Sequence, residues 1–311
     1  MNYQNILKKS FSIIWKNRFM WLLGFLAGGS FYQGGNYSFN DSDFEKLKDW
    51  KNLPDSNNVA EASVKSAEKV LGDSVSSAMS STAFWVILFF LIIIIIIFIY
   101  LHFTARGAII KSAEQLDAGK SLGLKNAWAF GRQYFWRVFI FSLVMAGIIL
   151  LGLLIAATPI VLLAIFEQTL AAIIFGIIFF LVFLVYLIYL SLVSTYAERI
   201  LILENKRAIE SIKLGIKFFN KSWKTIAVVY LIVMAISLIA AMVVIIAIIV
   251  PILFLTGIGA LFYLISSGLT FIYATIAILA LVVLFCTLMG MLNAYISTVY
   301  TLTYNELKSS D

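Results

Sequence analysis

The chain has 311 residues, of which 62% are hydrophobic and 13% are charged, and its mean hydropathy is +0.99. Soluble domains usually contain about 45–50% apolar and about 25% charged residues, so this composition excludes an ordinary soluble protein and predicts one integral membrane domain over residues 1–311. The net charge of +7 would suit a nucleic-acid-binding protein. However, the basic residues lie between apolar runs, and we therefore expect no nucleic-acid partner.

The first apolar run covers residues 19–32 and follows Lys8, Lys9, Lys16 and Arg18. A basic start, a short apolar stretch and small residues are also typical of a cleavable signal peptide. We nevertheless expect the run to be retained as the first membrane span, because the same basic and aromatic pattern recurs at two internal positions.

Residues 33–81 form a polar segment with eight acidic and five basic residues. Helical spacing of apolar residues within it predicts short helices that lie on the membrane or on each other. The other interpretation is a docking site for a protein partner. We expect this segment to be an extracytoplasmic insertion between the first and second spans.

Five longer apolar runs follow, and none contains lysine, arginine, aspartate or glutamate; they cover residues 84–103, 138–157, 170–192, 226–250 and 271–295. About 20 apolar residues in a helix cross a hydrocarbon core about 30 Å thick, so each run predicts a transmembrane helix. The stretch 253–264 is too short to span, and we interpret it as a re-entrant or surface turn.

The distribution of basic residues predicts the orientation. Segments 1–18, 105–137 and 197–224 carry four, six and seven lysines and arginines, whereas segment 33–81 has a net charge of −3. Because basic residues concentrate on the cytoplasmic side, we expect both termini in the cytoplasm and a multi-pass protein of the inner (cytoplasmic) cell membrane.

An internal threefold repeat is predicted over approximately residues 5–104, 122–196 and 210–304. Each copy begins with an aliphatic residue and a lysine (Leu7-Lys8, Leu124-Lys125, Ile212-Lys213) and reaches a basic and aromatic cluster before an apolar run. The ends also match: Phe103-Thr-Ala-Arg106 resembles Thr195-Tyr-Ala-Glu-Arg199. Pro159 and Pro251 are predicted to end the first helix of their hairpins. The expected fold is therefore all-α, with six transmembrane helices as three parallel hairpins, each preceded by a cytoplasmic interfacial amphipathic helix.

These amphipathic segments are expected to place basic and tryptophan side chains in the cytoplasmic interface, where they fix the depth of the helices. The other interpretation is that they recognise lipids, including anionic lipids. The predicted lipid-interface residues are Lys8, Lys9, Trp15, Arg18, Lys125, Trp128, Arg132, Trp136, Arg137, Lys213, Lys217, Lys221, Trp223 and Lys224.

Catalytic patterns are absent from the sequence. The chain has one histidine, His102, and one cysteine, Cys286, so it offers neither a zinc-binding set nor a serine–histidine–aspartate set with an evident partner. No glycine-rich phosphate loop occurs. We therefore predict no catalytic, metal or cofactor-binding residues and a protein that is not an enzyme.

Two stretches carry a family resemblance: Leu203-Glu-Asn-Lys-Arg-Ala-Ile-Glu-Ser-Ile-Lys-Leu214 with Trp223-Lys224, and Trp15-Lys-Asn-Arg-Phe-Met-Trp-Leu-Leu-Gly24. They resemble the membrane domain attached to some glycerophosphoryl diester phosphodiesterases and related six-helix bacterial proteins. Segment 33–81 falls outside the resemblance. The chain has no region resembling the attached enzyme, so the resemblance implies a non-catalytic membrane module.

Two functions follow as hypotheses. The first is a scaffold or accessory subunit that engages lipids or a protein partner at the cytoplasmic face. The alternative is a transporter or channel for a small or lipid-like solute, with Thr287 and Asn293 lining a polar path. The lack of charged residues within the predicted spans argues against ion coupling in the alternative.

Overall fold

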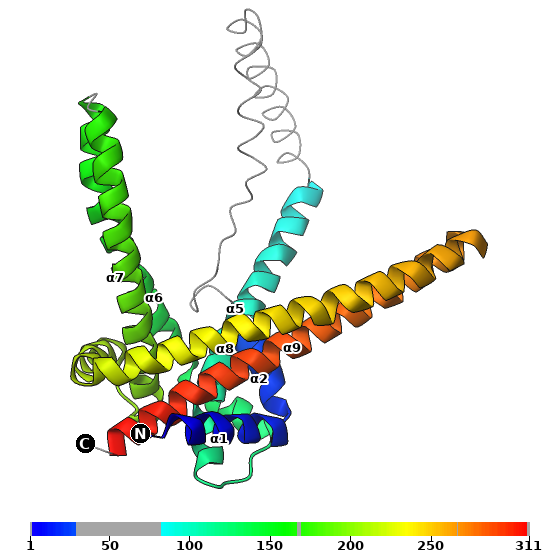
Figure 1. Cartoon of the computed structure of the whole chain (residues 1–311), viewed down its shortest axis with the longest axis horizontal. Helices are drawn as coiled ribbons and strands as arrows, with labels where there is room; N and C mark the ends of the chain where they lie inside the picture. The colour runs from blue at the N-terminus through cyan, green and yellow to red at the C-terminus, as the bar shows by residue number, and fades with distance from the viewer. Residues whose placement is uncertain (1, 29–81, 167–168, 266, 310–311) are drawn as a thin grey trace, which may run out of the picture. The chain divides into compact units, whose positions relative to one another are not determined.

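The computed structural model describes residues 2–28, 82–166, 169–265 and 267–309. Within these ranges the chain forms helices and no strand (Figure 1). The helices are α1 (Tyr3–Lys16), α2 (Phe19–Ala27), α5 (Thr82–Asp117), α6 (Leu124–Ile165), α7 (Thr169–Leu203), α8 (Ala208–Ile265) and α9 (Ser267–Ser309). The predicted insertion 33–81, the last part of the first apolar run, and Glu167 lie outside the described residues.

The chain divides into two compact units, of which one comprises Met1–Gly29 with Tyr100–Asp311 and the other Ser30–Ile99. The second unit is described only over 82–99, where α5 is apolar and its described side chains are half-buried or exposed. The first unit contains the rest of α5 and the other six helices. All contacts discussed below lie within it.

Five of the described helices, α5 to α9, are long and apolar enough to cross a membrane. The five predicted runs without charges all fall inside them. This confirms, for the described residues, the prediction of an all-α protein with several helices that are long and apolar enough to span a membrane. The first predicted span is described only as the nine residues of α2.

Two predictions about helix boundaries are wrong. Pro159 lies inside α6 and Pro251 lies inside α8, so neither proline ends its helix. Likewise, stretch 253–264 is part of α8 and is not a separate turn. A break within an apolar helix would leave backbone groups without partners in hydrocarbon, and a proline inside the helix costs less than such a break.

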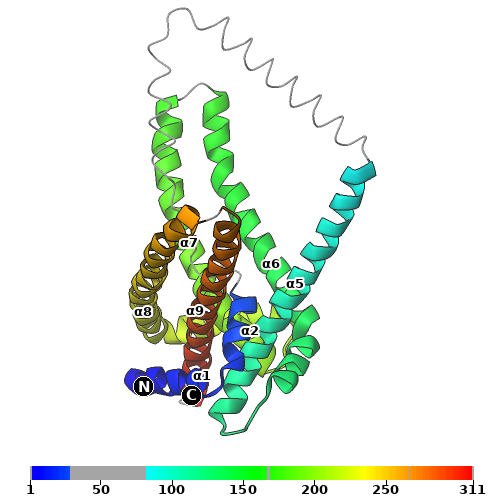
Figure 2. The same ribbon diagram turned by 90° about the vertical axis from the view of Figure 1, so that its right-hand side faces the viewer.

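The helices pair mainly as neighbours in the sequence. Figures 1 and 2 show α6 beside α7 and α8 beside α9, and α7 also lies against α8. The main exceptions are α1 and α2, which both pack on α9 at the other end of the chain. Between α5 and α6 the chain turns at Gly119, whose φ of +78° is readily adopted only by glycine.

Burial divides the first unit into two regions. The packed end comprises residues 3–27, 100–145, 190–233 and 290–309, and it contains every buried side chain of the described residues except Val244. The apolar arms comprise the rest of the four long helices, residues 146–166, 169–189, 234–265 and 267–289. Their large apolar side chains are mostly exposed, as expected where hydrocarbon is the solvent.

Candidate functional site

Close helix crossings hold the packed end together. A Cβ atom at Gly24 of α2 would meet the backbone oxygen of Gly290, and one at Gly290 of α9 would meet that of Trp21. Gly131 of α6 faces the backbone oxygen of Thr104 of α5 in the same way. Small residues at such crossings let helix backbones approach closely, which is a main source of helix association in membranes.

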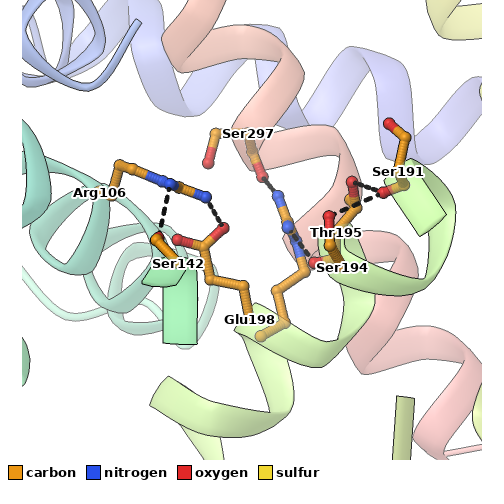
Figure 3. A network of polar contacts seen from close by, with 8 residues as sticks. Arg106, Ser142, Ser191, Ser194, Thr195, Glu198 and Ser297 are labelled. Atoms are coloured by element: carbon orange, nitrogen blue, oxygen red, sulfur yellow. Dashed lines mark hydrogen bonds and ion pairs between the residues drawn. The ribbon is translucent and has the colours of Figure 1, made fainter. Parts of the chain in front are cut away.

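A buried ion pair lies where α5, α6 and α7 meet (Figure 3). Arg106 Nη2 donates to Glu198 Oε2 at 2.7 Å, and Arg106 Nη1 donates to the hydroxyl of Ser142 at 3.3 Å. The side chains of Arg106 and Glu198 are 15% and 7% exposed. Charged groups so far from water are retained only when they are paired.

Arg199 extends this group toward α9. It is 3% exposed, and its Nη2 donates to the backbone oxygen of Ser297 at 3.2 Å. Its Nη1 donates to the backbone oxygen of Thr195, and its guanidinium lies 5.3 Å from the centre of the Tyr300 ring. We call Arg106, Glu198 and Arg199 the charge cluster; its contacts connect four helices, α5, α6, α7 and α9, with one carboxylate and two guanidinium groups.

The charge cluster follows the predicted repeat. When Phe103-Thr-Ala-Arg106 and Thr195-Tyr-Ala-Glu-Arg199 are aligned on their alanines, Arg106 and Glu198 occupy equivalent positions, 92 residues apart. The ion pair therefore joins matching positions of these two motifs, just beyond the ends of the predicted repeats 5–104 and 122–196. The likeness of the two motifs predicted the repeat but not this pairing, because the pairing depends on how the helices pack.

The predicted lipid-interface residues lie on α1, on the first turns of α6 and α8, and next to α2. Every one of them is exposed except Trp128, which is half-buried. Lys9 pairs with Asp117 at 2.6 Å, and Arg137 donates to the backbone and side-chain oxygens of Asn205. We call this exposed set the basic–aromatic surface.

An aromatic contact chain lies where α1 meets α2. The rings of Phe11 and Trp15 are stacked with centres 5.7 Å apart, and Trp15 lies 5.8 Å from Trp21. Trp21 Nε1 donates to the backbone oxygen of Ile14 at 3.0 Å, which fixes its polar edge. Trp15 remains 52% exposed, and aromatic side chains of this kind favour the membrane interface.

Three other polar residues considered from the sequence lie against backbone, either of their own helix or of α2. His102 lies with Nδ1 3.2 Å from the backbone oxygen of Leu26. Thr287 is exposed and donates to the backbone oxygen of Val283 in its own helix. The amide of Asn293 lies against Gly28, at the end of α2. Among the described residues, no group of three or more histidine, cysteine, aspartate or glutamate side chains is arranged to hold a metal ion.

Comparison with known proteins found no matching family model, no matching curated protein and no matching solved structure. The resemblance to the phosphodiesterase-associated membrane domain therefore stays a prediction. The basic–aromatic surface and the charge cluster are therefore the two features of the structure that bear on function.

Proposed function

We propose that the protein is a non-catalytic multi-span membrane protein that binds anionic lipid at its cytoplasmic face and acts there as a scaffold or accessory subunit. The observation that carries this proposal is the basic–aromatic surface. Its lysine, arginine and tryptophan side chains come from three separate parts of the chain, and nearly all are exposed.

Contacts within the packed end support placing these side chains at one end of the helices. Lys9 of α1 pairs with Asp117 at the end of α5, and Arg137 of α6 bonds to Asn205 just after α7. The backbone of Asn2 donates to Glu306 near the end of α9 at 3.2 Å. The first turns of α6 and the last turns of α5, α7 and α9 therefore lie at the same end of the helices, together with α1.

The proposal includes six spans, with residues 19–32 as the first, and both termini in the cytoplasm of an inner-membrane protein. The basic residues of the packed end would then face anionic headgroups, to which each contributes about 1 kcal/mol. Exposed tryptophans such as Trp136 and Trp223 would lie among the headgroups. A protein partner would bind at this face or at segment 33–81.

The test compares lipid retention by the purified protein and by two charge variants. The first is Lys213→Gln/Lys217→Gln/Lys224→Gln, which neutralises three exposed lysines of α8. The matched control, Lys46→Gln/Lys48→Gln/Lys51→Gln, changes the net charge equally but lies in segment 33–81. Native mass spectrometry in low salt measures the binding of phosphatidylglycerol relative to phosphatidylcholine.

We expect the α8 variant to lose up to about 100-fold in preference for phosphatidylglycerol, because three contributions of about 1 kcal/mol are removed. The control variant should retain the preference. Equal loss in both variants, or no preference in the unmodified protein, would refute lipid binding by the basic–aromatic surface.

A further inference from the structure

The charge cluster carries more positive than negative charge. Its two guanidinium groups face one carboxylate, and that carboxylate is paired with Arg106 at 2.7 Å. Arg199 makes no salt bridge with any described acidic side chain, although it is 3% exposed. A buried charge without a counter-charge is costly, by several kcal/mol in real proteins.

The other acidic side chains that the structure describes are engaged elsewhere. Four of them form ion pairs away from the cluster: Glu114 with Lys111, Asp117 with Lys9, Glu204 with Lys308, and Glu210 with Lys206. The fifth, Glu306, accepts a hydrogen bond from the backbone of Asn2. The counter-charge for Arg199 is therefore not supplied by another described carboxylate.

Two buried atoms of the cluster have complementary hydrogen-bonding needs. Among the described residues, Arg199 Nε, a donor, and Glu198 Oε1, an acceptor, have no hydrogen-bond partner. Buried polar atoms are nearly always paired, so these two indicate a group that both accepts and donates. Because Arg199 makes no salt bridge with a described carboxylate, an anion suits this position.

We propose that the charge cluster binds one phosphate monoester group. A singly protonated phosphate has oxygens that accept from the planar guanidinium of Arg199 and a hydroxyl that donates to Glu198 Oε1. The partly exposed side chain of Arg106, at 15%, is the side from which the group enters. This site uses buried residues and is separate from the basic–aromatic surface of the proposed function.

The phosphate group has two sources, a phospholipid headgroup or a free phosphate. Arg106 follows the apolar run 84–103 by three residues, and the run 170–192 ends shortly before Glu198, so the cluster lies near the level of headgroups. Phosphatidic acid is the phospholipid with a monoester headgroup. Phosphatidylglycerol is an equally anionic lipid whose phosphate is a diester without the P–OH group.

The test measures the melting temperature of detergent-purified protein with sodium phosphate against sodium chloride at equal ionic strength. Parallel samples contain phosphatidic acid or phosphatidylglycerol. A ligand that binds only the folded state raises the melting temperature. We expect a saturable rise of several degrees with phosphatidic acid, with inorganic phosphate, or with both, and a smaller rise with phosphatidylglycerol. A rise with the lipid alone identifies the lipid as the source.

Arg199→Met removes the charge at similar length and should abolish the rise. The control, Lys120→Met, removes one exposed charge outside the basic–aromatic surface and should leave the rise unchanged. Arg199→Lys keeps a charge but lacks the planar guanidinium, so it should reduce the rise, and it carries the test if Arg199→Met does not fold. The proposal is overturned if neither phosphate nor phosphatidic acid exceeds its control, or if the Arg199 variants respond like the unmodified protein. Neither result affects the proposed function, whose test alters exposed lysines.

Discussion

The packed end and the apolar arms belong to the same helices but differ in what surrounds their side chains. In α6, Val138, Phe141 and Met145 are at most 1% exposed, whereas Leu154 and Ile155 further along are 55% and 73% exposed. The amino acids are similarly apolar in both regions, so hydrophobicity alone does not determine where the helices associate.

The difference lies in small and polar residues. The packed end contains the glycine crossings and the charge cluster, while each pair of arms is joined by contacts such as Tyr186 Oη donating to the Ile148 backbone oxygen at 2.9 Å. In lipid, burying an apolar side chain against another helix gains little, because hydrocarbon is equally apolar. Close backbone approach and polar pairing therefore determine the packed end.

The largest effect is expected from Glu198→Gln. This variant keeps the shape of the side chain but leaves Arg106 without its charged partner, and breaking a buried ion pair in this way typically costs about 3–5 kcal/mol. Unfolding in mixed micelles, followed by circular dichroism, measures the loss. Glu210→Gln is the matched control, since Glu210 pairs with Lys206 on an exposed surface, and it should show no measurable change. Similar behaviour of both variants would mean that the charge cluster contributes nothing to the packed end.

A smaller loss is expected from Gly131→Ala. The added Cβ atom meets the backbone oxygen of Thr104, and because backbone cannot rotate away, α5 and α6 must separate. Overpacking of this kind costs about 1–3 kcal/mol.

Gly147→Ala in the arm of the same helix provides the control for this prediction. No atom lies within 4 Å of its added Cβ. The free energy of unfolding of this variant should be unchanged or up to about 1 kcal/mol higher, because alanine has a higher helix propensity than glycine. If Gly131→Ala is as stable as Gly147→Ala in the same unfolding assay, the close crossing is not required.

The smallest effect is expected at the outer edge of the packed end, at Glu204. Burial alone would raise the pKa of this carboxyl, but hydrogen bonds from Lys308 at 2.7 Å and Tyr304 at 2.5 Å outweigh it and lower the pKa. Because this pKa is lowered on folding, the stabilisation that ionised Glu204 provides is complete above the ordinary glutamate pKa of about 4.3. It is lost as the pH falls through the lower pKa of the folded state.

Lys308→Met should therefore cost no more than about 1 kcal/mol near neutral pH, since Lys308 is 56% exposed and ion pairs at the surface contribute little. The difference between the variant and the unmodified protein should shrink as the carboxyl becomes protonated. Melting temperatures measured from neutral to acidic pH check this trend. A difference that grows on acidification would contradict the assigned pKa direction.

The sequence predicted the helical class and the five longer apolar runs, because a run of about 20 residues without charge, such as 84–103, has few alternatives to a membrane helix. It failed at Pro159 and Pro251. A proline predicts a helix end in water, but in hydrocarbon the cost of unpaired backbone groups keeps the helix intact.

The candidate site was predicted only in part. Exposure of basic residues such as Lys217 followed from their amphipathic spacing, which is a local property. The pairing of Arg106 with Glu198 depends on how α5 and α7 pack across 92 residues, and no local pattern contains that information. The matching motifs around Ala105 and Ala197 were the available signal, since equivalent positions of a repeat can face each other.

The central claim is that the helices associate at the packed end and contact lipid along the arms. The most direct test compares Met145→Ala with Leu154→Ala, two truncations in α6 at residues that are 0% and 55% exposed. Met145→Ala should lower the free energy of unfolding by about 1–2 kcal/mol, because the truncation leaves a cavity between packed helices, and Leu154→Ala should change it little, because lipid fills the space. Equal losses in the two variants would contradict the account, because the arm would then be packed as tightly as the packed end.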